Sequence, residues 1–126
     1  MIHIVGAGPG DPELITVKGA RYLGEADVVI YAGSLVNPAL LKMCKDGAEI
    51  HNSAHMTLDE VVEVIAQAES AGKMTVRLHT GDPAIYGAIQ EQMDAWEKRG
   101  FDYDVVPGVS SFLGTAAALR QEYTLP

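Results

Sequence analysis

Short apolar runs alternate with amphipathic segments along this chain. The apolar runs predict strands at residues 2–5, 28–31, 74–78 and 103–106, with a brief further strand at 49–51. Apolar residues at helical spacing between and after these runs predict helices at residues 14–23, 38–44, 57–70, 84–99 and 111–120. This alternation predicts an α/β fold with a mostly parallel open sheet and helices on both faces.

Three of the helices carry more specific expectations. The 57–70 helix begins with a capping box formed by Thr57 and Glu60. The 84–99 helix is expected to be the longest. The expected apolar faces are Leu14, Val17, Ala20 and Leu23 in the first helix, Val61, Val64, Ile65 and Ala68 in the third, and Ile85, Ala88, Ile89, Gln92 and Trp96 in the fourth.

Three glycine-bearing turns each follow a predicted strand and open a helical segment. They are GAGPGD at residues 6–11, GDPAIYG at 81–87 and PGVSS at 107–111. All three turns therefore fall on the carboxyl edge of a parallel sheet, where small ligands bind in open α/β folds. The chain is expected to hold a small molecule largely through backbone groups.

Composition narrows the possible partners. The formal net charge is −8 and the basic residues are scattered rather than gathered in a stripe, so no nucleic-acid partner is expected. No apolar run approaches the roughly 20 residues that span a bilayer, so no membrane partner is expected and the protein is expected in the cytoplasm. His51 and His55 have the spacing of a metal pair, but no third ligand is evident and no metal site is expected.

The first turn leaves a dinucleotide alternative open. Gly6, Gly8 and Gly10 approach the G-x-G-x-x-G pattern, but Asp11 stands where the third glycine is required. Pro9 also removes one backbone N–H from the turn. Besides a domain that binds some other small molecule, two alternatives remain open. One is a nicotinamide-binding oxidoreductase domain, and the other is a non-catalytic interaction domain. No catalytic triad is evident, and no catalytic residue is assigned.

Four segments in order resemble the tetrapyrrole (corrin/porphyrin) methylases, which use S-adenosylmethionine. They are GAGPGDPELIT, ADVVIYAGSLV, RLHTGDPAIYGA and VVPGVSSFLGTAAAL. YAGSLVNP, HNSAHMTLDE and GDPAIYGAIQEQM look most similar to the precorrin-4 C11-methyltransferases, including those acting on cobalt-precorrin-4. The resemblance implies methylation of a tetrapyrrole at C11 during cobalamin biosynthesis, although other branches of the family share the turns.

The resemblance also implies a fold of two domains, about twice the length of this chain. Residues 1–126 would be the N-terminal domain, the C-terminal domain would be absent, and the whole protein would be a homodimer. S-adenosylmethionine would lie in the cleft between the domains. The cofactor contacts that carry over by motif are Pro9, Thr80, Gly81, Asp82, Ile85, Ser110 and Ser111. Proximity to the strand ends adds Tyr31, Ser34, His79 and Tyr86 as the border of a substrate groove.

One departure separates the branches of the family. Members that methylate uroporphyrinogen carry an aspartate after the second strand, where this chain has Ala32 and Gly33, and a lysine near residues 51–53. Both groups are missing, which argues against that branch and leaves any catalytic base unassigned. The substrate carries many carboxylates, and some of the basic residues are expected to face it, from among Lys18, Arg21, Lys42, Arg77 and Arg120.

Overall fold

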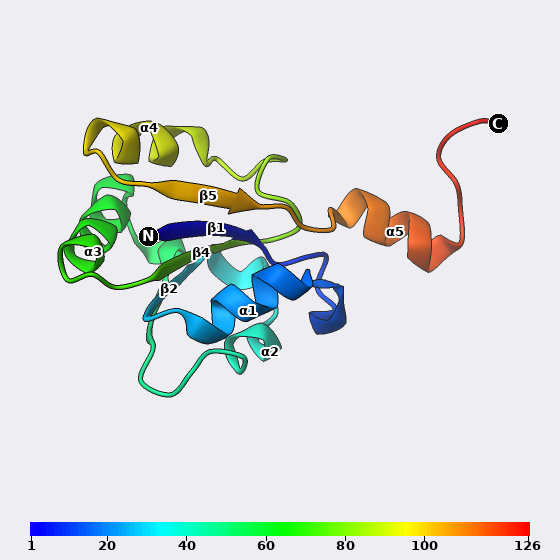
Figure 1. Ribbon diagram of the computed structural model, residues 1–126. Coiled ribbons are helices and arrows are strands. Elements are labelled where there is room, and N and C mark those ends of the chain that lie inside the picture. Colours follow the sequence, from blue (N-terminus) through cyan, green and yellow to red (C-terminus); the bar gives the residue numbers. More distant parts are fainter.

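One five-stranded sheet forms the centre of the molecule. The computed structural model describes residues 1–126, apart from the side chain of Ser34. All strand pairs are parallel, and the order across the sheet is β3-β2-β4-β1-β5 (Figure 1). The strands are β1 (Ile2–Gly6), β2 (Val28–Tyr31), β3 (Glu49–Asn52), β4 (Thr75–His79) and β5 (Tyr103–Val106). The predicted strands are confirmed to within one residue at each end.

Helices cover both faces of the sheet, as predicted. Helices α1 and α2 lie on one face, and α3 and α4 lie on the other (Figure 1). The helices are α1 (Val17–Glu25), α2 (Pro38–Leu41), α3 (Leu58–Ser70), α4 (Gln90–Lys98) and α5 (Ser111–Leu119). Three short 3₁₀ turns join them to the strands, η1 (Pro12–Leu14), η2 (Gly33–Leu35) and η3 (Ser53–His55).

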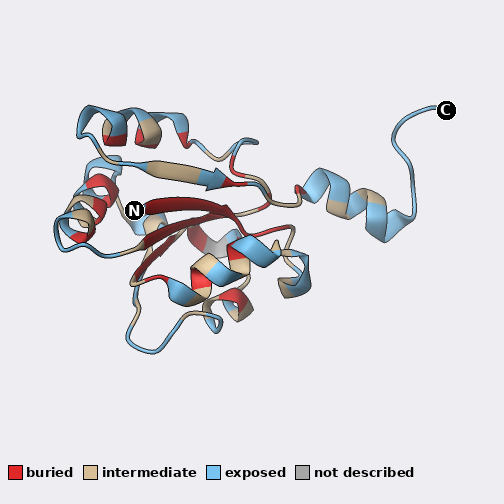
Figure 2. Cartoon of the chain, viewed as in Figure 1, coloured by how far each residue is buried: buried red, intermediate tan, exposed pale blue. Residues whose placement is uncertain are grey.

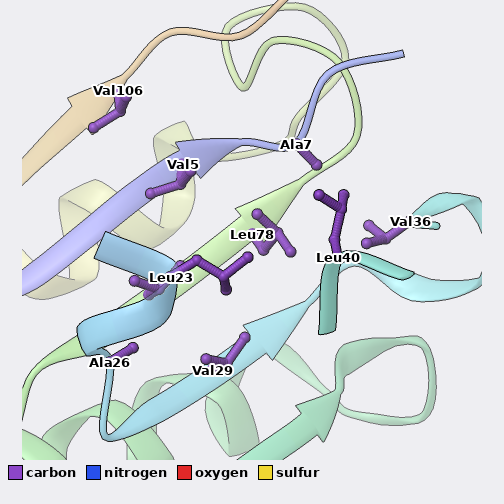
Figure 3. Close-up of a cluster of buried hydrophobic side chains, with 10 residues drawn as sticks. Val5, Ala7, Leu23, Ala26, Val29, Val36, Leu40, Leu78 and Val106 are labelled. Carbon is purple, nitrogen blue, oxygen red and sulfur yellow. The ribbon is translucent and has the colours of Figure 1, made fainter. Parts of the chain in front are cut away.

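Two apolar clusters form the core, one on each face of the sheet. Figure 3 shows the first, in which Leu23 of α1 and Leu40 of α2 pack on Val5 and Leu78. In the second, helix residues such as Ile65 and Trp96 pack on the opposite face of the same strands. The central strands are consequently buried along their length (Figure 2). This rigid sheet fixes where the turns at its carboxyl edge lie.

The predicted cap of α3 by Thr57 is present, but Glu60 contacts the Thr57 hydroxyl rather than its backbone N–H, so the capping box forms only in part. The backbone N–H of Glu60 donates to Thr57 Oγ1 at 3.1 Å, and the Thr57 hydroxyl lies 3.3 Å from Glu60 Oε1. The buried face of α3 consists of Val61, Val62, Ile65 and Ala68, with Val64 only half-buried. At 13 residues, α3 rather than α4 is the longest helix of the described chain.

The predicted helix at 84–99 is wrong over its first six residues, because α4 begins only at Gln90. Tyr86 and Ala88 have positive φ angles of 57° and 52°, on either side of Gly87. Left-handed residues at two positions interrupt the helical backbone. Ile85 and Ala88 are therefore exposed in a loop, whereas the later residues of the predicted face pack against the sheet.

The predicted helix at 14–23 also begins late, because two caps divide the segment. Asp11 caps η1 by accepting from the N–H of Glu13, and Thr16 caps α1 by accepting from the N–H of Gly19. Leu14 and Val17, expected on the apolar face, are exposed as a result. Helix α2 is likewise shorter than predicted and ends at Leu41.

Helix α5 extends beyond the carboxyl edge of the sheet (Figure 1). None of the residues of α5 is buried, and Figure 2 shows most of the helix as exposed. The capping Ser110, which precedes the helix, is buried. Phe112, Leu113 and Leu119 each expose more than half of their surface. None of the helices in the described chain has the length and apolar character needed to cross a bilayer.

Candidate ligand site at the carboxyl edge

The three glycine-bearing turns follow β1, β4 and β5, which are neighbours in the sheet. The chain leaves β1 toward β2 on one side and leaves β4 toward β5 on the other. The topological switch point therefore lies between β1 and β4. Ligands of open α/β sheets bind in the crevice outside the carboxyl ends of the strands at such a point.

Three glycines bring the turns into backbone contact. A Cβ atom on Gly6 would lie 2.6 Å from the Cα of Gly108 and 2.7 Å from the carbonyl oxygen of Gly81. A Cβ atom on Gly108 would lie 2.1 Å from that same oxygen. Both positions exclude any larger residue, because no side-chain rotation relieves a clash with backbone. Here glycine is required for the packing of one turn on another.

The first two turns are also joined by hydrogen bonds. The N–H of Gly8 donates to the carbonyl of Gly81 at 3.2 Å, and the N–H of Gly81 donates to the carbonyl of Gly8 at 2.8 Å. The N–H of Ala7 donates to the carbonyl of His79 at the end of β4. The backbone groups used in this way hold the turns together and fix the shape of the edge.

Asp82 connects the second turn to the third. One carboxylate oxygen accepts from the backbone N–H of Ala84 at 2.8 Å, and the other accepts from the backbone N–H of Gly108 at 2.9 Å. The first bond caps the turn locally, whereas the second spans 26 residues of sequence. Asp82 therefore has a structural role that its motif did not reveal.

A cavity of about 290 Å³ opens beside the second and third of these turns and the turn after β2. This volume is at the lower end of the range for small-molecule sites, roughly 300–1,000 Å³. The cavity is lined by Ala32, Leu35, His79, Thr80, Gly81, Asp82, Ile85, Tyr86, Gly87, Ser110 and Ser111. It thus brings together most of the residues that the sequence placed in a cofactor site or a substrate groove.

Two of the predicted site residues that the structure describes do not line this cavity. Pro9 packs against α5, where a Cβ on Gly114 would lie 2.8 Å from the Pro9 Cβ. Pro9 instead lines an adjoining hollow that shares Ser111 with the cavity. Tyr31 packs against the apolar cluster on the α1 and α2 face. The side chain of Ser34 lies outside the described residues.

Three lining residues were not predicted from the sequence. Ala32 and Leu35 come from the turn after β2, and Gly87 comes from the loop before α4. The exposed fraction of Leu35 is 76 %. The only sequence signal for Leu35 is an apolar residue in a short polar turn, which is too common to identify a ligand contact.

His79 gives the cavity an unusual buried polar group. Its exposed fraction is 3 %, and its Nε2 atom has no hydrogen-bond partner. Burial, together with the positive charge of Arg77, lowers the pKa of the imidazole to about 3 from its ordinary 6.5. His79 is therefore neutral at physiological pH.

The structure separates the basic residues that were considered for substrate carboxylates. Lys18 and Arg21 lie over the ring of Tyr22, which stacks on His3 on the α1 face of the sheet. Lys42 and Arg120 are exposed at the ends of α2 and α5. Arg77 alone is buried, two residues before the cavity-lining His79.

Another hollow lies at the opposite edge of the sheet. It measures about 740 Å³ and is lined by Glu63, Gln67, Ser70, Arg99 and Phe101, with Ala66 and Ala71. These residues come from the end of α3 and the segment before β5, at the amino ends of the strands. Because ligands of such sheets bind at the carboxyl ends, the smaller cavity is the better candidate.

Metal ligands do not gather in the described part of the chain. His51 is the third residue of β3 and His55 ends η3, so the pair does not share a helix. Among the described residues, no three histidine, cysteine or acidic side chains come close enough to hold an ion.

Comparison with known proteins identifies relatives along the whole chain. The family model of the tetrapyrrole (corrin/porphyrin) methylases matches residues 1–126. The cobalt-precorrin-4 C(11)-methyltransferase of Methanocaldococcus jannaschii is 59% identical over 99% of this chain and 48% of its own length. The chain therefore spans about half the length of the curated relatives it matches.

Solved structures agree with the sequence relatives. The structure of a cobalt-precorrin-4 methyltransferase, CbiF, superposes with a TM-score of 0.97 at 52% identity, covering 99% of this chain and 52% of that one. A uroporphyrin-III C-methyltransferase from Thermus thermophilus in complex with S-adenosylhomocysteine superposes with a TM-score of 0.78 at 35% identity. That match covers 91% of this chain and 47% of the other. These matches favour the methylase interpretation over the nicotinamide alternative.

Proposed function

Because this chain belongs to the tetrapyrrole (corrin/porphyrin) methylase family, we propose that it is the cofactor-binding half of a methyltransferase that acts on a corrin precursor. The reaction is transfer of a methyl group from S-adenosylmethionine to C11 of precorrin-4 or cobalt-precorrin-4, within cobalamin biosynthesis. The proposal rests on the cavity at the carboxyl edge of the sheet, which is lined by the turns after β2, β4 and β5. It rests equally on the similarity of the chain to the cobalt-precorrin-4 enzymes.

The residues of this edge fit S-adenosylmethionine. The cofactor has polar amino-acid and ribose groups joined to an adenine ring, and it needs both hydrogen-bonding groups and apolar contacts. The cavity offers Thr80, Ser110 and Ser111 beside the apolar side chain of Ile85. We assign the cofactor contacts to these four residues, to Gly81 and Asp82, and to Pro9 in the adjoining hollow.

The bound cofactor supplies an activated methyl group, so the protein need not generate a strong electrophile. The acceptor in this family is an electron-rich ring carbon, for which a general base is not obligatory at the transfer step. Holding two reactants in line can supply up to roughly 7–11 kcal/mol of the acceleration. The contribution of this chain is therefore alignment by turns whose backbones are fixed by Asp82 and the three glycines.

The substrate is a large flat macrocycle, and the rim of the cavity is apolar and exposed. Leu35, Ile85 and Tyr86 have exposed fractions of 76 %, 54 % and 103 %. Apolar and aromatic side chains are suited to contact with the face of such a ring. We place the macrocycle against this rim, with His79 deeper in the cavity beneath it.

We further propose that a second domain of similar length completes the site. The curated relatives are about twice as long as this chain, and α5 presents Phe112, Leu113 and Leu119 to solvent. Contiguous exposed apolar residues of this kind mark surfaces that another domain or subunit covers. In this arrangement, α5 leads from the sheet into the second domain, and two such chains form a homodimer.

The direct test is methylation by the full-length protein. It is incubated with precorrin-4 or cobalt-precorrin-4 and S-adenosylmethionine labelled with ¹³C in the methyl group. A product one methyl group heavier, with the label attached to C11, is the expected result. Label at another ring carbon, or transfer only to uroporphyrinogen, would refute the assignment to this branch.

A further inference from the structure

Strand β4 has an unusual polar face. It is flanked on both sides, by β2 and β1, and each of its residues is buried. Val76 and Leu78 pack in the cluster with α1, so the alternate residues Thr75, Arg77 and His79 face α3 and α4. Interior strands of parallel sheets are usually apolar on both faces. One face of β4 is instead a buried polar column that ends at the cavity.

Arg77 is the charged member of this column. Its exposed fraction is 5 %. Its Nε donates to Gln92 Oε1 of α4 at 2.9 Å, and its Nη1 donates to the carbonyl oxygen of Ile30 at 3.2 Å. Both acceptors are neutral. Among the described residues, no carboxylate lies within ion-pair distance of Arg77.

This isolated charge is costly. Burial lowers the pKa of the guanidinium to about 10, which leaves it protonated at neutral pH. A buried charge without a counter-charge is unfavourable, because no ion pair offsets the loss of its hydration. Asp82 is the acid nearest in sequence, but its two oxygens are bound to the N–H groups of Ala84 and Gly108. The fold itself therefore leaves the Arg77 charge uncompensated.

His79 connects this charge to the cavity. It follows Arg77 on the same face of β4 and lines the cavity. Its Nε2 is buried and without a partner. A neutral imidazole carries one N–H donor. The Nε2 atom exposes almost no surface in this structure, so the ring must shift for an anionic ligand group to hydrogen-bond it. That group would then also be attracted by the charge of Arg77.

We propose that His79 and Arg77 form an anion subsite at the floor of the cavity, in which a ligand carboxylate supplies the missing counter-charge. His79 makes the contact, and Arg77, which does not line the cavity, acts as a positioning residue through its charge. The subsite rests on the proposed function for the identity of its ligand. The carboxylate comes either from the amino-acid end of the cofactor or from an acid side chain of the macrocycle.

The test compares two nucleosides that differ in one carboxylate. Calorimetry on the full-length protein measures the affinity for S-adenosylhomocysteine and for its decarboxylated analogue, S-adenosyl-3-thiopropylamine. If the cofactor supplies the carboxylate, Arg77→Met weakens the affinity for S-adenosylhomocysteine by about tenfold or more. It weakens the affinity for the decarboxylated analogue by less than about twofold. Arg77→Lys, which keeps the charge, retains most of the affinity. Arg99→Met is the matched control, because Arg99 is half-exposed at the far edge of the sheet.

If the macrocycle supplies the carboxylate, Arg77→Met leaves both nucleoside affinities unchanged and raises KM for the corrin precursor by about tenfold. His79→Phe, which removes the N–H but keeps a ring, gives the same pattern and serves if Arg77→Met does not fold. The proposed subsite would be refuted if both variants weakened the affinities for the two nucleosides equally. It would also be refuted if neither variant changed any affinity or the KM. A wild-type protein that binds neither nucleoside would refute the proposed function, and the subsite with it.

Discussion

The carboxylate of Asp82 accepts a hydrogen bond from the backbone N–H of Gly108 at 2.9 Å, and so joins the turn after β4 to the turn after β5. The chain contains a second Gly-Asp-Pro sequence at residues 10–12. Asp11 there makes the same local cap, to the N–H of Glu13. The two aspartates thus differ mainly in the bond that Asp82 makes across the candidate site.

This pair of aspartates gives a matched test of the cross-turn bond. We expect Asp82→Ala to lower the free energy of unfolding by about 2–4 kcal/mol, because two backbone N–H groups lose their acceptor. Asp11→Ala removes one exposed cap and should cost about 1 kcal/mol. Urea denaturation of the two variants measures the difference.

The same variants separate stability from ligand binding. Asp82→Ala should weaken S-adenosylhomocysteine binding by about tenfold or more, because the turns that line the cavity lose their fixed spacing. Asp11→Ala should weaken binding less than Asp82→Ala does, because Asp11 lines only the adjoining hollow beside Pro9 and makes no bond between the turns. Equal losses of affinity in the two variants would show that Asp82 has no special role at the site.

Glycine at position 108 is predicted to be irreplaceable. Gly108→Ala would place a Cβ atom 2.1 Å from the carbonyl oxygen of Gly81, and neither backbone can move without disrupting the sheet edge. We expect a loss of about 3 kcal/mol or more, or failure to fold. Gly24→Ala in α1 is the control, because its nearest neighbour would be 3.5 Å away and alanine favours a helix. Thermal unfolding that is unchanged in Gly108→Ala would contradict the structure.

The neutral state of His79 predicts that acid destabilises the fold. Its pKa is about 3 in the folded protein and 6.5 ordinarily, so the unfolded chain takes up a proton first as the pH falls. The stability due to this group is complete above pH 6.5 and is lost progressively toward pH 3. At pH 4 the loss from this residue is about 3 kcal/mol.

His79→Gln isolates this contribution, because glutamine is polar and does not titrate. The difference in unfolding free energy between wild type and variant should change by about 3 kcal/mol between pH 7 and pH 4, in favour of the variant at the lower pH. Chemical denaturation at a series of pH values measures it. Parallel pH profiles for the two proteins would show that His79 titrates normally in the folded state.

Glycine substitutions in the loop before α4 distinguish the relief of backbone strain from the loss of a substrate contact. Tyr86 and Ala88 are both exposed and both left-handed. Glycine at either position should leave stability unchanged or raise it by up to about 1 kcal/mol, because glycine adopts this conformation without strain. If Tyr86 contacts the macrocycle, Tyr86→Gly alone raises KM for the corrin precursor. An unchanged KM in Tyr86→Gly would remove Tyr86 from the substrate groove.

The strands, and the edge of the sheet at which the cavity opens, could be predicted from the sequence. Apolar runs rich in valine and isoleucine have few alternatives to a buried parallel strand, and the strand ends fix which turns share an edge. The predicted helix at 84–99 was wrong over its first six residues, because tertiary contacts overrode the local helical pattern. Its residues suit a helix locally, but the turn bound by Asp82 leads into left-handed Tyr86 and Ala88, and this constraint is tertiary.

Contacts between distant residues also lay beyond sequence reasoning. The packing of Pro9 on Gly114 and the bond from Gly108 to Asp82 depend on how the strands are ordered. In the sequence, Arg77 is one of several scattered basic residues. Only the structure shows that it is buried, two residues before the buried His79. Burial and pairing of charges are properties of the folded chain, and no pattern of spacing encodes them.

Calorimetric titration of the full-length protein with S-adenosylhomocysteine, with NADH as the control ligand, tests whether this edge of the sheet holds the methylase cofactor. We expect saturable binding of S-adenosylhomocysteine and none of NADH, because the turns at the carboxyl edge form a methylase cofactor site. Binding of NADH alone would contradict this and restore the nicotinamide alternative. Binding of neither ligand would contradict the assignment of a cofactor site to this edge of the sheet.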